Sequence, residues 1–125
     1  MAAQRPNKPT KVRPVMDNRK LNEGIVSKSG VDAVVCQEKL RRWRKRGVNV
    51  HLLDLKQVYL QIHVDRSLQQ FQAVKFRGKL YVMIRMGFGL NVAPKIMLKA
   101  LDKVLSMDAN IEKGTDHYID DIWID

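Results

Sequence analysis

The chain has 125 residues, of which 45% are hydrophobic and 29% charged, a composition that is typical of one globular domain and excludes a wholly disordered chain. Its 23 lysines and arginines outnumber 13 acidic residues and leave a formal charge of +10, which favours a polyanionic partner such as nucleic acid. The single cysteine and three isolated histidines exclude a disulfide framework and a zinc site, and without a secretion signal or a long apolar run we expect an intracellular protein, cytoplasmic or nuclear, with no membrane partner.

Strand and helix patterns alternate along the chain, which predicts an α+β fold. The predicted elements are, in order, a flexible lead-in at 1–10, a strand at 12–17, a polar connection at 18–30, a helix between the caps Asp32 and Gly47, a buried strand at 48–53, a hairpin of 71–76 with 80–85, a helix at 91–106 and a hairpin after Gly114.

Both predicted helices have one apolar face. The first places Cys36, Leu40 and Trp43 at i, i+4 and i+7, which favours a single buried stripe. The second repeats apolar pairs at the helical period opposite a row of lysines, and Asn91 can cap its first turn. We therefore expect each helix to bury one side and expose the other.

The other face of the first helix is strongly basic. Six cations lie within the eight residues from Lys39 to Arg46, more than solubility requires, although most charge runs are solvated faces. We predict that Arg41, Arg42, Arg44 and Lys45 bind a nucleic-acid backbone. A solvated face or a nuclear-targeting role are the alternatives.

Two adjacent carboxylates, Asp120 and Asp121, interrupt an otherwise apolar strand near the end of the chain. Such charges repel each other and resist burial, so their setting favours a divalent cation between them. Asp54 ends another apolar strand, and two such strand ends side by side would present three carboxylates at one edge of a sheet. This arrangement suits two Mg²⁺ ions and nucleotidyl transfer. Ordinary turn residues are the alternative reading.

Four segments resemble motifs of reverse transcriptases and follow one another in that family's order. Residues 11–22 resemble the fingers motif and 53–62 the first catalytic motif; 88–94 are similar to the substrate-positioning motif, and 118–121 match the Tyr-x-Asp-Asp signature. The resemblance is greatest to enzymes of long-terminal-repeat retrotransposons. It implies RNA-directed DNA polymerase activity in a larger retroelement polyprotein.

The resemblance also implies how the chain is organised. Residues 1–125 would form a single incomplete α+β domain of a right-hand polymerase, an antiparallel sheet with helices packed on one face and no thumb. Its parts would be a fingers-like segment at about 1–47, palm at 48–62, a fingers-like hairpin at 63–85 and palm at 86–125. Downstream polymerase and ribonuclease H segments would follow in the parent polyprotein. The 125-residue chain alone is expected to be inactive.

Catalytic roles follow from the same resemblance. It implies that Asp54, Asp120 and Asp121 are the catalytic metal ligands, joined by the main-chain carbonyl of Leu55. The cofactor would be a pair of Mg²⁺ ions, with Mn²⁺ as the alternative. The partners would be an RNA or DNA template-primer and deoxynucleoside triphosphates.

The resemblance further implies a nucleotide-binding set. Arg13, with Lys11 near it, matches the arginine that pairs with the incoming triphosphate, and a planar guanidinium suits that role. Tyr59 matches the bulky gate that rejects a 2′-hydroxyl, and Phe88 lies where the family places a residue under the nucleotide. A solvated arginine, a half-buried tyrosine and simple core packing are the ordinary alternatives. Gly87 departs from the proline of many relatives, which leaves the path of its loop open.

Two other classes of function compete with this reading. A Gly-Phe-Gly segment at 87–89 resembles part of an RNA-recognition sheet, but Pro94 forbids the central strand that such a module needs. A truncated or inactive copy that only binds nucleic acid is the second, against which the three intact carboxylates argue. Five further aspartates are read as solvated or capping residues: Asp17, Asp65, Asp102, Asp108 and Asp116.

Overall fold

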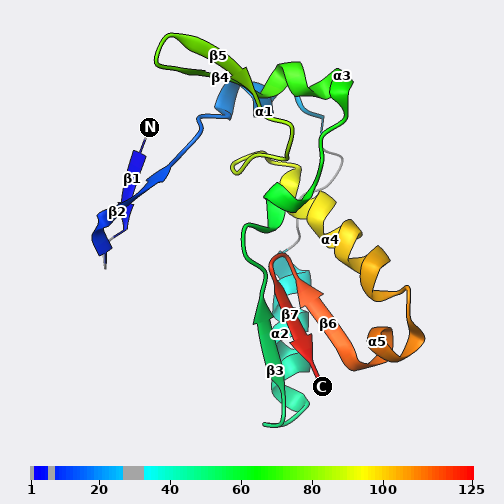
Figure 1. Ribbon diagram of the computed structural model, residues 1–125. Coiled ribbons are helices and arrows are strands. Elements are labelled where there is room, and N and C mark those ends of the chain that lie inside the picture. The colour runs from blue at the N-terminus through cyan, green and yellow to red at the C-terminus, as the bar shows by residue number, and fades with distance from the viewer. Residues whose placement is uncertain (1, 6–7, 27–32) are drawn as a thin grey trace. The chain divides into compact units, whose positions relative to one another are not determined.

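The computed structural model describes the backbone of residues 2–5, 8–26 and 33–125 and the side chains of 15–26 and 35–125. The predicted cap Asp32 and the last part of the predicted connection, 27–30, lie outside the described residues. The chain divides into two compact units, each built from two segments (Figure 1). Unit 1 is Met1–Val26 with Tyr59–Ala93, and unit 2 is Ser27–Val58 with Pro94–Asp125.

Unit 1 contains two hairpins and several short helices. Its elements are β1 (Ala2–Arg5), β2 (Lys8–Pro14), α1 (Arg19–Gly24), most of the 3₁₀ turn η1 (Val58–Gln61), α3 (Arg66–Gln69), the 3₁₀ turn η2 (Gln70–Gln72), β4 (Ala73–Phe76) and β5 (Lys79–Val82). β1 pairs antiparallel with β2, with Ala3 opposite Arg13. β4 pairs antiparallel with β5 through the two-residue turn Arg77-Gly78.

Two sequence expectations are wrong in unit 1. The lead-in forms the paired strand β1, and the connection contains the helix α1. Both elements are only four to six residues long, too short for a hydrophobic period to emerge from the sequence. The predicted hairpin at 71–85 is confirmed in its core. Arg77 and Gly78 both have positive φ, +48° and +75°, as a tight two-residue hairpin turn requires.

The core of unit 1 lies under the loop that precedes the second long helix. Met86, Leu90 and Ala93 are all at most 8% exposed. Six half-buried apolar side chains pack on them: Leu21, Ile25, Tyr59, Ile62, Val64 and Val92. This packing ties η1 and the 86–93 loop to the end of α1.

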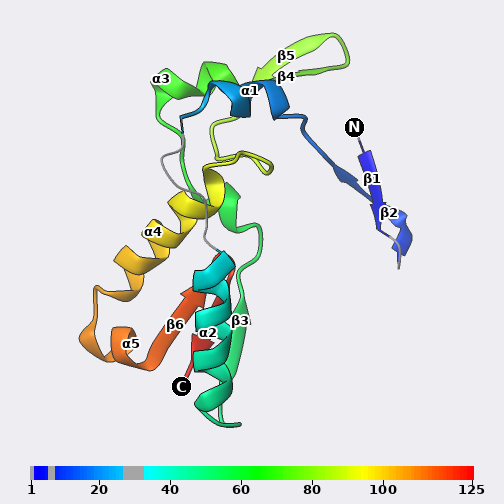
Figure 2. The ribbon, with the colours of Figure 1, turned by 180° about the vertical axis from the view of Figure 1, so that it is seen from behind.

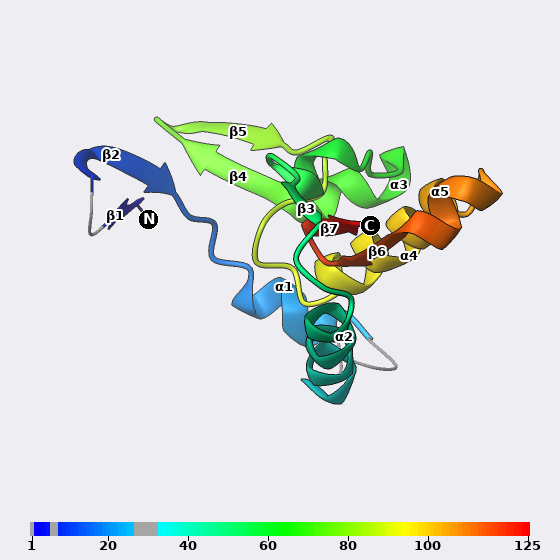
Figure 3. The same cartoon turned by 90° about the horizontal axis from the view of Figure 1, so that it is seen from below.

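Unit 2 contains a three-stranded antiparallel sheet and three helices. Its elements are α2 (Ala33–Lys45), β3 (His51–Asp54), nearly all of α4 (Ala93–Leu105), α5 (Ala109–Gly114), β6 (Thr115–Tyr118) and β7 (Asp121–Ile124). The strand order is β3-β7-β6. The apolar residues Ile122 and Trp123 suit β7 to its central place, and they are buried. α2 covers one face of this sheet (Figures 2 and 3).

The α+β class, with an antiparallel sheet and a covering helix, is confirmed, while several details differ. The strand predicted as buried is the edge strand β3, whose residues are all exposed, Leu52 at 61%. It pairs only with β7 among the described strands. α4 buries Ala93, Met97 and Leu101 at helical spacing, as predicted. It begins at Ala93, and the side chain of Asn91, expected as its cap, donates instead to the backbone carbonyl of Asn22.

The apolar face predicted for α2 is confirmed at Cys36 and Trp43, which are half-buried, and is wrong at Leu40. Leu40 is 47% exposed, whereas Lys39, Trp43 and Arg46 contact residues of the sheet. These contacts are largely polar, so a count of apolar residues misses them. The helix ends where predicted, with Gly47 at φ +95°.

None of the helices in the described part of the chain has the length and apolar character to span a bilayer. The compact units group α2 with β3 and the 86–93 loop with unit 1. The division into fingers-like and palm ranges stays a prediction.

Candidate active site

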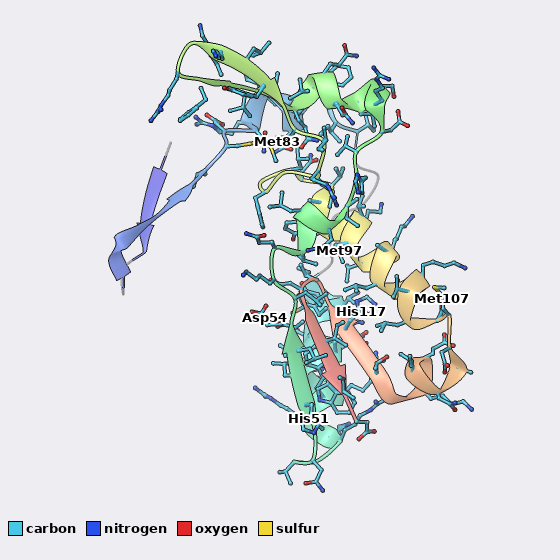
Figure 4. All side chains as sticks on the ribbon, viewed as in Figure 1. His51, Asp54, Met83, Met97, Met107 and His117 are labelled. Atoms are coloured by element: carbon cyan, nitrogen blue, oxygen red, sulfur yellow. The ribbon has the colours of Figure 1, made fainter. Side chains whose placement is uncertain are left out.

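Three aspartates meet at one end of the sheet of unit 2. β3 and β7 run antiparallel with Asp54 directly opposite Asp121, so the last residue of one strand faces the first residue of the other. Asp120 precedes β7 in the turn of the β6–β7 hairpin. Figure 4 shows Asp54 where β3 ends beside that hairpin. The juxtaposition expected from the sequence is therefore present.

The backbone holds this end of the sheet together. The Leu55 N–H donates to the Asp120 carbonyl at 2.8 Å, which extends the β3–β7 pairing into the turn. Ile119, the first residue of the two-residue turn, has φ +57°. A β-branched residue rarely adopts this conformation, at a cost of about 1–3 kcal/mol. The surrounding pairing must therefore stabilise the turn that presents Asp120.

The three carboxylates interact electrostatically. Burial raises the pKa of Asp121, and the negative charges of Asp120 and Asp54 raise it further. Asp54 and Asp120 are exposed, and Asp121 is half-buried. The site thus concentrates negative charge that a bound cation would relieve.

The donor set suits a hard divalent cation. Carboxylate oxygens and backbone carbonyls, such as that of Leu55, are the ligands that Mg²⁺ and Mn²⁺ prefer. Within the described residues, no group of three or more acidic, histidine or cysteine side chains is placed so that it could hold a metal ion. The fit therefore rests on donor chemistry and on the mutual repulsion of the carboxylates.

In unit 1, two residues predicted to bind the nucleotide contact each other. The rings of Tyr59 and Phe88 pack edge to face, with centroids 5.4 Å apart and planes at 70°. Tyr59 is half-buried, while Phe88 is 50% exposed. Arg13 and Lys11 lie in β2, and their side chains are outside the described residues.

Two asparagines that the sequence did not single out fix the loop bearing Phe88. Asn18 donates its side-chain amide to the Phe88 carbonyl at 2.8 Å, and Asn22 donates to the Gly89 carbonyl at 2.9 Å. The Asn22 side chain also accepts from the Asn91 N–H. Their i, i+4 spacing, which places both on one side of a helical turn, was the available signal.

The surroundings of Gly87 explain why glycine, and not proline, suits this position in the loop. The Gly87 N–H donates to the buried side chain of Gln72 at 2.9 Å, a bond that proline has no hydrogen to make. A Cβ at this position would also meet that same Gln72 oxygen at 3.0 Å. The glycine that departs from many relatives thus fits the local packing.

Comparison with known proteins decides the family. The sequence profile described as reverse transcriptase (RNA-dependent DNA polymerase) matches residues 5–124. The chain belongs to the reverse transcriptase family. An uncharacterized protein of Caenorhabditis elegans is 33% identical over 63 residues, which cover 50% of this chain and 5% of that protein.

Solved structures share the fold of this reverse transcriptase chain. The protease-reverse transcriptase of prototype foamy virus covers 98% of it with a TM-score of 0.70 and 17% identity. Foamy viral protease-reverse transcriptase structures in complex with an RNA/DNA hybrid and with double-stranded DNA each cover 99%, with TM-scores of 0.72 and identities of 18% and 19%. The chain spans 16–24% of the length of these structures.

The cations of α2 in this reverse transcriptase chain fall into two groups, those that contact the sheet and those that are exposed. Lys39 and Arg46 contact the sheet, Arg46 with its guanidinium 4.9 Å from the centroid of a Trp123 ring. The four cations predicted to bind nucleic acid remain exposed: Arg41, Arg42, Arg44 and Lys45. Of these, Arg42 lies 3.8 Å from Asp116.

Asp116, read from the sequence as solvated or capping, is instead the anchor of this helix. Its side chain is 13% exposed and accepts from the Lys39 ammonium at 2.7 Å and the Trp43 indole at 2.9 Å. Lys39 also donates to the His117 carbonyl. Burial acts to raise the pKa of Asp116, but these hydrogen bonds and the Lys39 charge together hold it below the usual value.

The other four aspartates also have hydrogen-bond partners. Asp65 and Asp108 cap α3 and α5 through backbone N–H groups, as predicted. Asp17 pairs with Arg19, whose hydrogen bond lowers the pKa of Asp17 to about 2. Asp102 lies 2.7 Å from the ring of His117, which Figure 4 places on β6.

Proposed function

We propose that this chain supplies part of the fingers and palm of a reverse transcriptase that copies an RNA or DNA template by adding deoxynucleotides to a primer 3′-hydroxyl. The parent would be a retroelement polyprotein, most like those of long-terminal-repeat retrotransposons, with downstream polymerase and ribonuclease H segments. The observation that carries the proposal is the pairing of Asp54 with Asp121 beside Asp120. The nucleic acids named for the foamy viral structures support a template-primer as the partner.

The mechanism assigns distinct tasks to the residues of the site. Asp54, Asp120 and Asp121, with the Leu55 carbonyl, would hold two Mg²⁺ ions; when bound, these lower the pKa of the primer hydroxyl and neutralise charge on the triphosphate. The β3–β7 pairing sets the backbone of Asp54 opposite that of Asp121 before substrate arrives. Arg13 and Lys11 would pair with the triphosphate, and Phe88 would lie under the nucleotide.

A full-length polymerase that contains residues 1–125 tests this function. With Mg²⁺, deoxynucleotides and a primed RNA template, we expect primer extension whose product sequence follows the template, and no extension when Mg²⁺ is chelated. Binding of the template-primer without any extension would favour the alternative, an inactive copy that serves as a basic nucleic-acid-binding module. The exposed cations of α2 are the observation that keeps this alternative open.

Tyr59 as a sugar gate gives a prediction about selectivity. In that full-length polymerase, Tyr59→Val should admit ribonucleotides while deoxynucleotide use continues, because it removes ring volume but leaves the carboxylates intact. The readout is the ratio of kcat/KM for the two nucleotides, and we expect a shift of roughly ten-fold or more. Phe71→Val removes an exposed ring outside the predicted nucleotide-binding set, should leave the ratio unchanged, and serves as the matched control. Unchanged selectivity in the Tyr59 variant would assign that ring to packing alone.

The basic helix gives a prediction about salt dependence. Changing Arg41, Arg42, Arg44 and Lys45 to glutamine should weaken duplex binding by the 125-residue chain whatever the sequence. Each lost phosphate contact should flatten the slope of log affinity against log salt by about 0.9. The control replaces four exposed lysines elsewhere, with the same change in net charge: Lys20, Lys99, Lys103 and Lys113. Equal effects of the two variants would mean that only net charge matters.

A further inference from the structure

The β4–β5 hairpin lies in a stretch of the chain that has no negative charge. From Arg66 to Ala93 the sequence contains five cations and no aspartate or glutamate. Three of the cations, Lys75, Arg77 and Lys79, belong to the hairpin and are exposed. The turn of the hairpin projects beyond α1 and α3 of the same unit (Figures 1 and 2). The hairpin is therefore an exposed basic element.

One face of this hairpin also carries two exposed aromatic rings. Phe76 is paired with Lys79, and Val74 with Tyr81, so these four side chains share a face. Phe76 is 58% exposed and Tyr81 52% exposed. As diagonal cross-strand neighbours, their positions are roughly 7 Å apart. The guanidinium of Arg77 lies 5.2 Å from the centroid of the Phe76 ring.

The chemistry of this face favours an unpaired nucleic-acid strand over other occupants. Aromatic rings interleaved with cations are how proteins bind single strands, since every base has a face that can stack and every nucleotide has a phosphate. Paired bases in a duplex do not offer those faces. A second copy of this chain would bring the same positive charge against the hairpin.

We propose that Phe76, Tyr81, Arg77 and Lys79 form a binding surface for single-stranded nucleic acid, with bases stacked on the two rings and phosphates paired with the two cations. The inference rests on the proposed function, because a polymerase that copies a template encounters the unpaired part of that strand. It adds a site distinct from the exposed face of α2 and from the carboxylates.

The test compares unpaired and paired ligands on the 125-residue chain. Fluorescence anisotropy measures affinity for single-stranded RNA and DNA of about ten nucleotides and for a blunt duplex of the same length. Phe76→Leu with Tyr81→Leu should weaken binding of the single strands by roughly ten-fold or more while leaving the duplex unchanged. Phe76→Tyr with Tyr81→Phe keeps both rings and should restore affinity. A loss for RNA alone, or for DNA alone, identifies which strand the surface accepts.

Two controls separate stacking from general effects. Leu80→Ala with Val82→Ala alters apolar residues on the opposite face of the hairpin and should change nothing. Arg77→Gln with Lys79→Gln should flatten the salt slope for single strands by about 0.7 per lost contact. Equal losses for duplex and single strands, or normal single-strand affinity in the double leucine variant, would overturn the proposal. So would a double leucine variant that changes only self-association in sedimentation velocity.

The outcome is independent of polymerase chemistry. Single-strand binding is measured without Mg²⁺ and without deoxynucleotides, so it does not require the carboxylate site to work. Template-dependent extension by the full-length polymerase, together with normal binding by the double leucine variant, would reject the hairpin surface and keep the proposed function. Conversely, weaker single-strand binding by the double leucine variant, together with no primer extension by the full-length polymerase, would keep the hairpin surface and reject the proposed function.

Discussion

Replacing Asp54 or Asp121 by asparagine is expected to abolish Mg²⁺-dependent primer extension by a full-length polymerase that contains this chain. Asparagine keeps the shape of the side chain but removes the negative charge that would hold the ion. Losing a ligand to an ion that bears transition-state charge should cost several kcal/mol of barrier, roughly a 10³-fold loss of rate. Single-turnover extension measures this directly.

The matched control is another Asp→Asn change that leaves the site alone. Asp108 caps α5 through the N–H groups of Asn110 and Ile111, and asparagine caps almost equally well, so Asp108→Asn should extend primers normally. A second readout uses the 125-residue chain itself. Mn²⁺ should broaden the amide resonances of residues 54 and 120–121 in the parent and much less in Asp54→Asn. Near-normal extension by either site variant would remove the metal-ligand assignment.

The placement of Asp54, Asp120 and Asp121 at one end of a sheet was predictable from the sequence because its signal is local. Asp120 and Asp121 interrupt an apolar strand, and Asp54 ends one, so each anomaly is visible without knowledge of the fold. Antiparallel pairing of two strands then places an end of one beside the start of the other, as the Asp54–Asp121 pair demonstrates. The hairpin at Arg77-Gly78 was predictable for the same reason, since its turn chemistry lies in adjacent residues.

Two kinds of feature were not predictable from the sequence: very short helices and strands, and polar contacts between residues far apart in the chain. β1, α1 and α5 are too short to show a period. On α2 an apolar count favours Leu40, which is exposed, and misses Lys39, which donates to the carboxylate of Asp116 more than seventy residues later. A single sequence offers no signal for which aspartate meets which lysine.

The backbone conformation of Ile119 in the β6–β7 turn is one that isoleucine rarely adopts. An isoleucine at φ +57° contradicts the usual preference for glycine or asparagine in such a turn. The conformation sets Asp120 immediately beside the Asp54–Asp121 pair, and the Leu55 N–H bond to Asp120 helps to maintain it. Local rules tend to be broken at functional sites, and the compensation lies in the neighbouring pairing.

Asp116→Ala is expected to destabilise the 125-residue chain by about 2–3 kcal/mol. The change leaves Lys39, whose side chain is only 18% exposed, without its carboxylate partner, and it deprives the Trp43 indole of its acceptor. For a domain of this size the midpoint of thermal unfolding should fall by about 10 °C. Asp17→Ala is the matched control, because the Asp17–Arg19 pair is exposed and should contribute little.

The contribution of Asp116 should also depend on pH with a definite sign. Because the folded state lowers the pKa of Asp116 below its ordinary value of 3.8, the stabilisation is present above that value and is lost as pH falls through the folded pKa. The difference in unfolding free energy between the parent and Asp116→Asn should therefore be largest near neutral pH and shrink below about pH 3.8. A double-mutant cycle with Lys39→Met should give a coupling energy above 0.5 kcal/mol. A pH-independent difference with no coupling would mean that Asp116 acts only by filling space, and that α2 is held to the sheet by Trp43 and Arg46 instead.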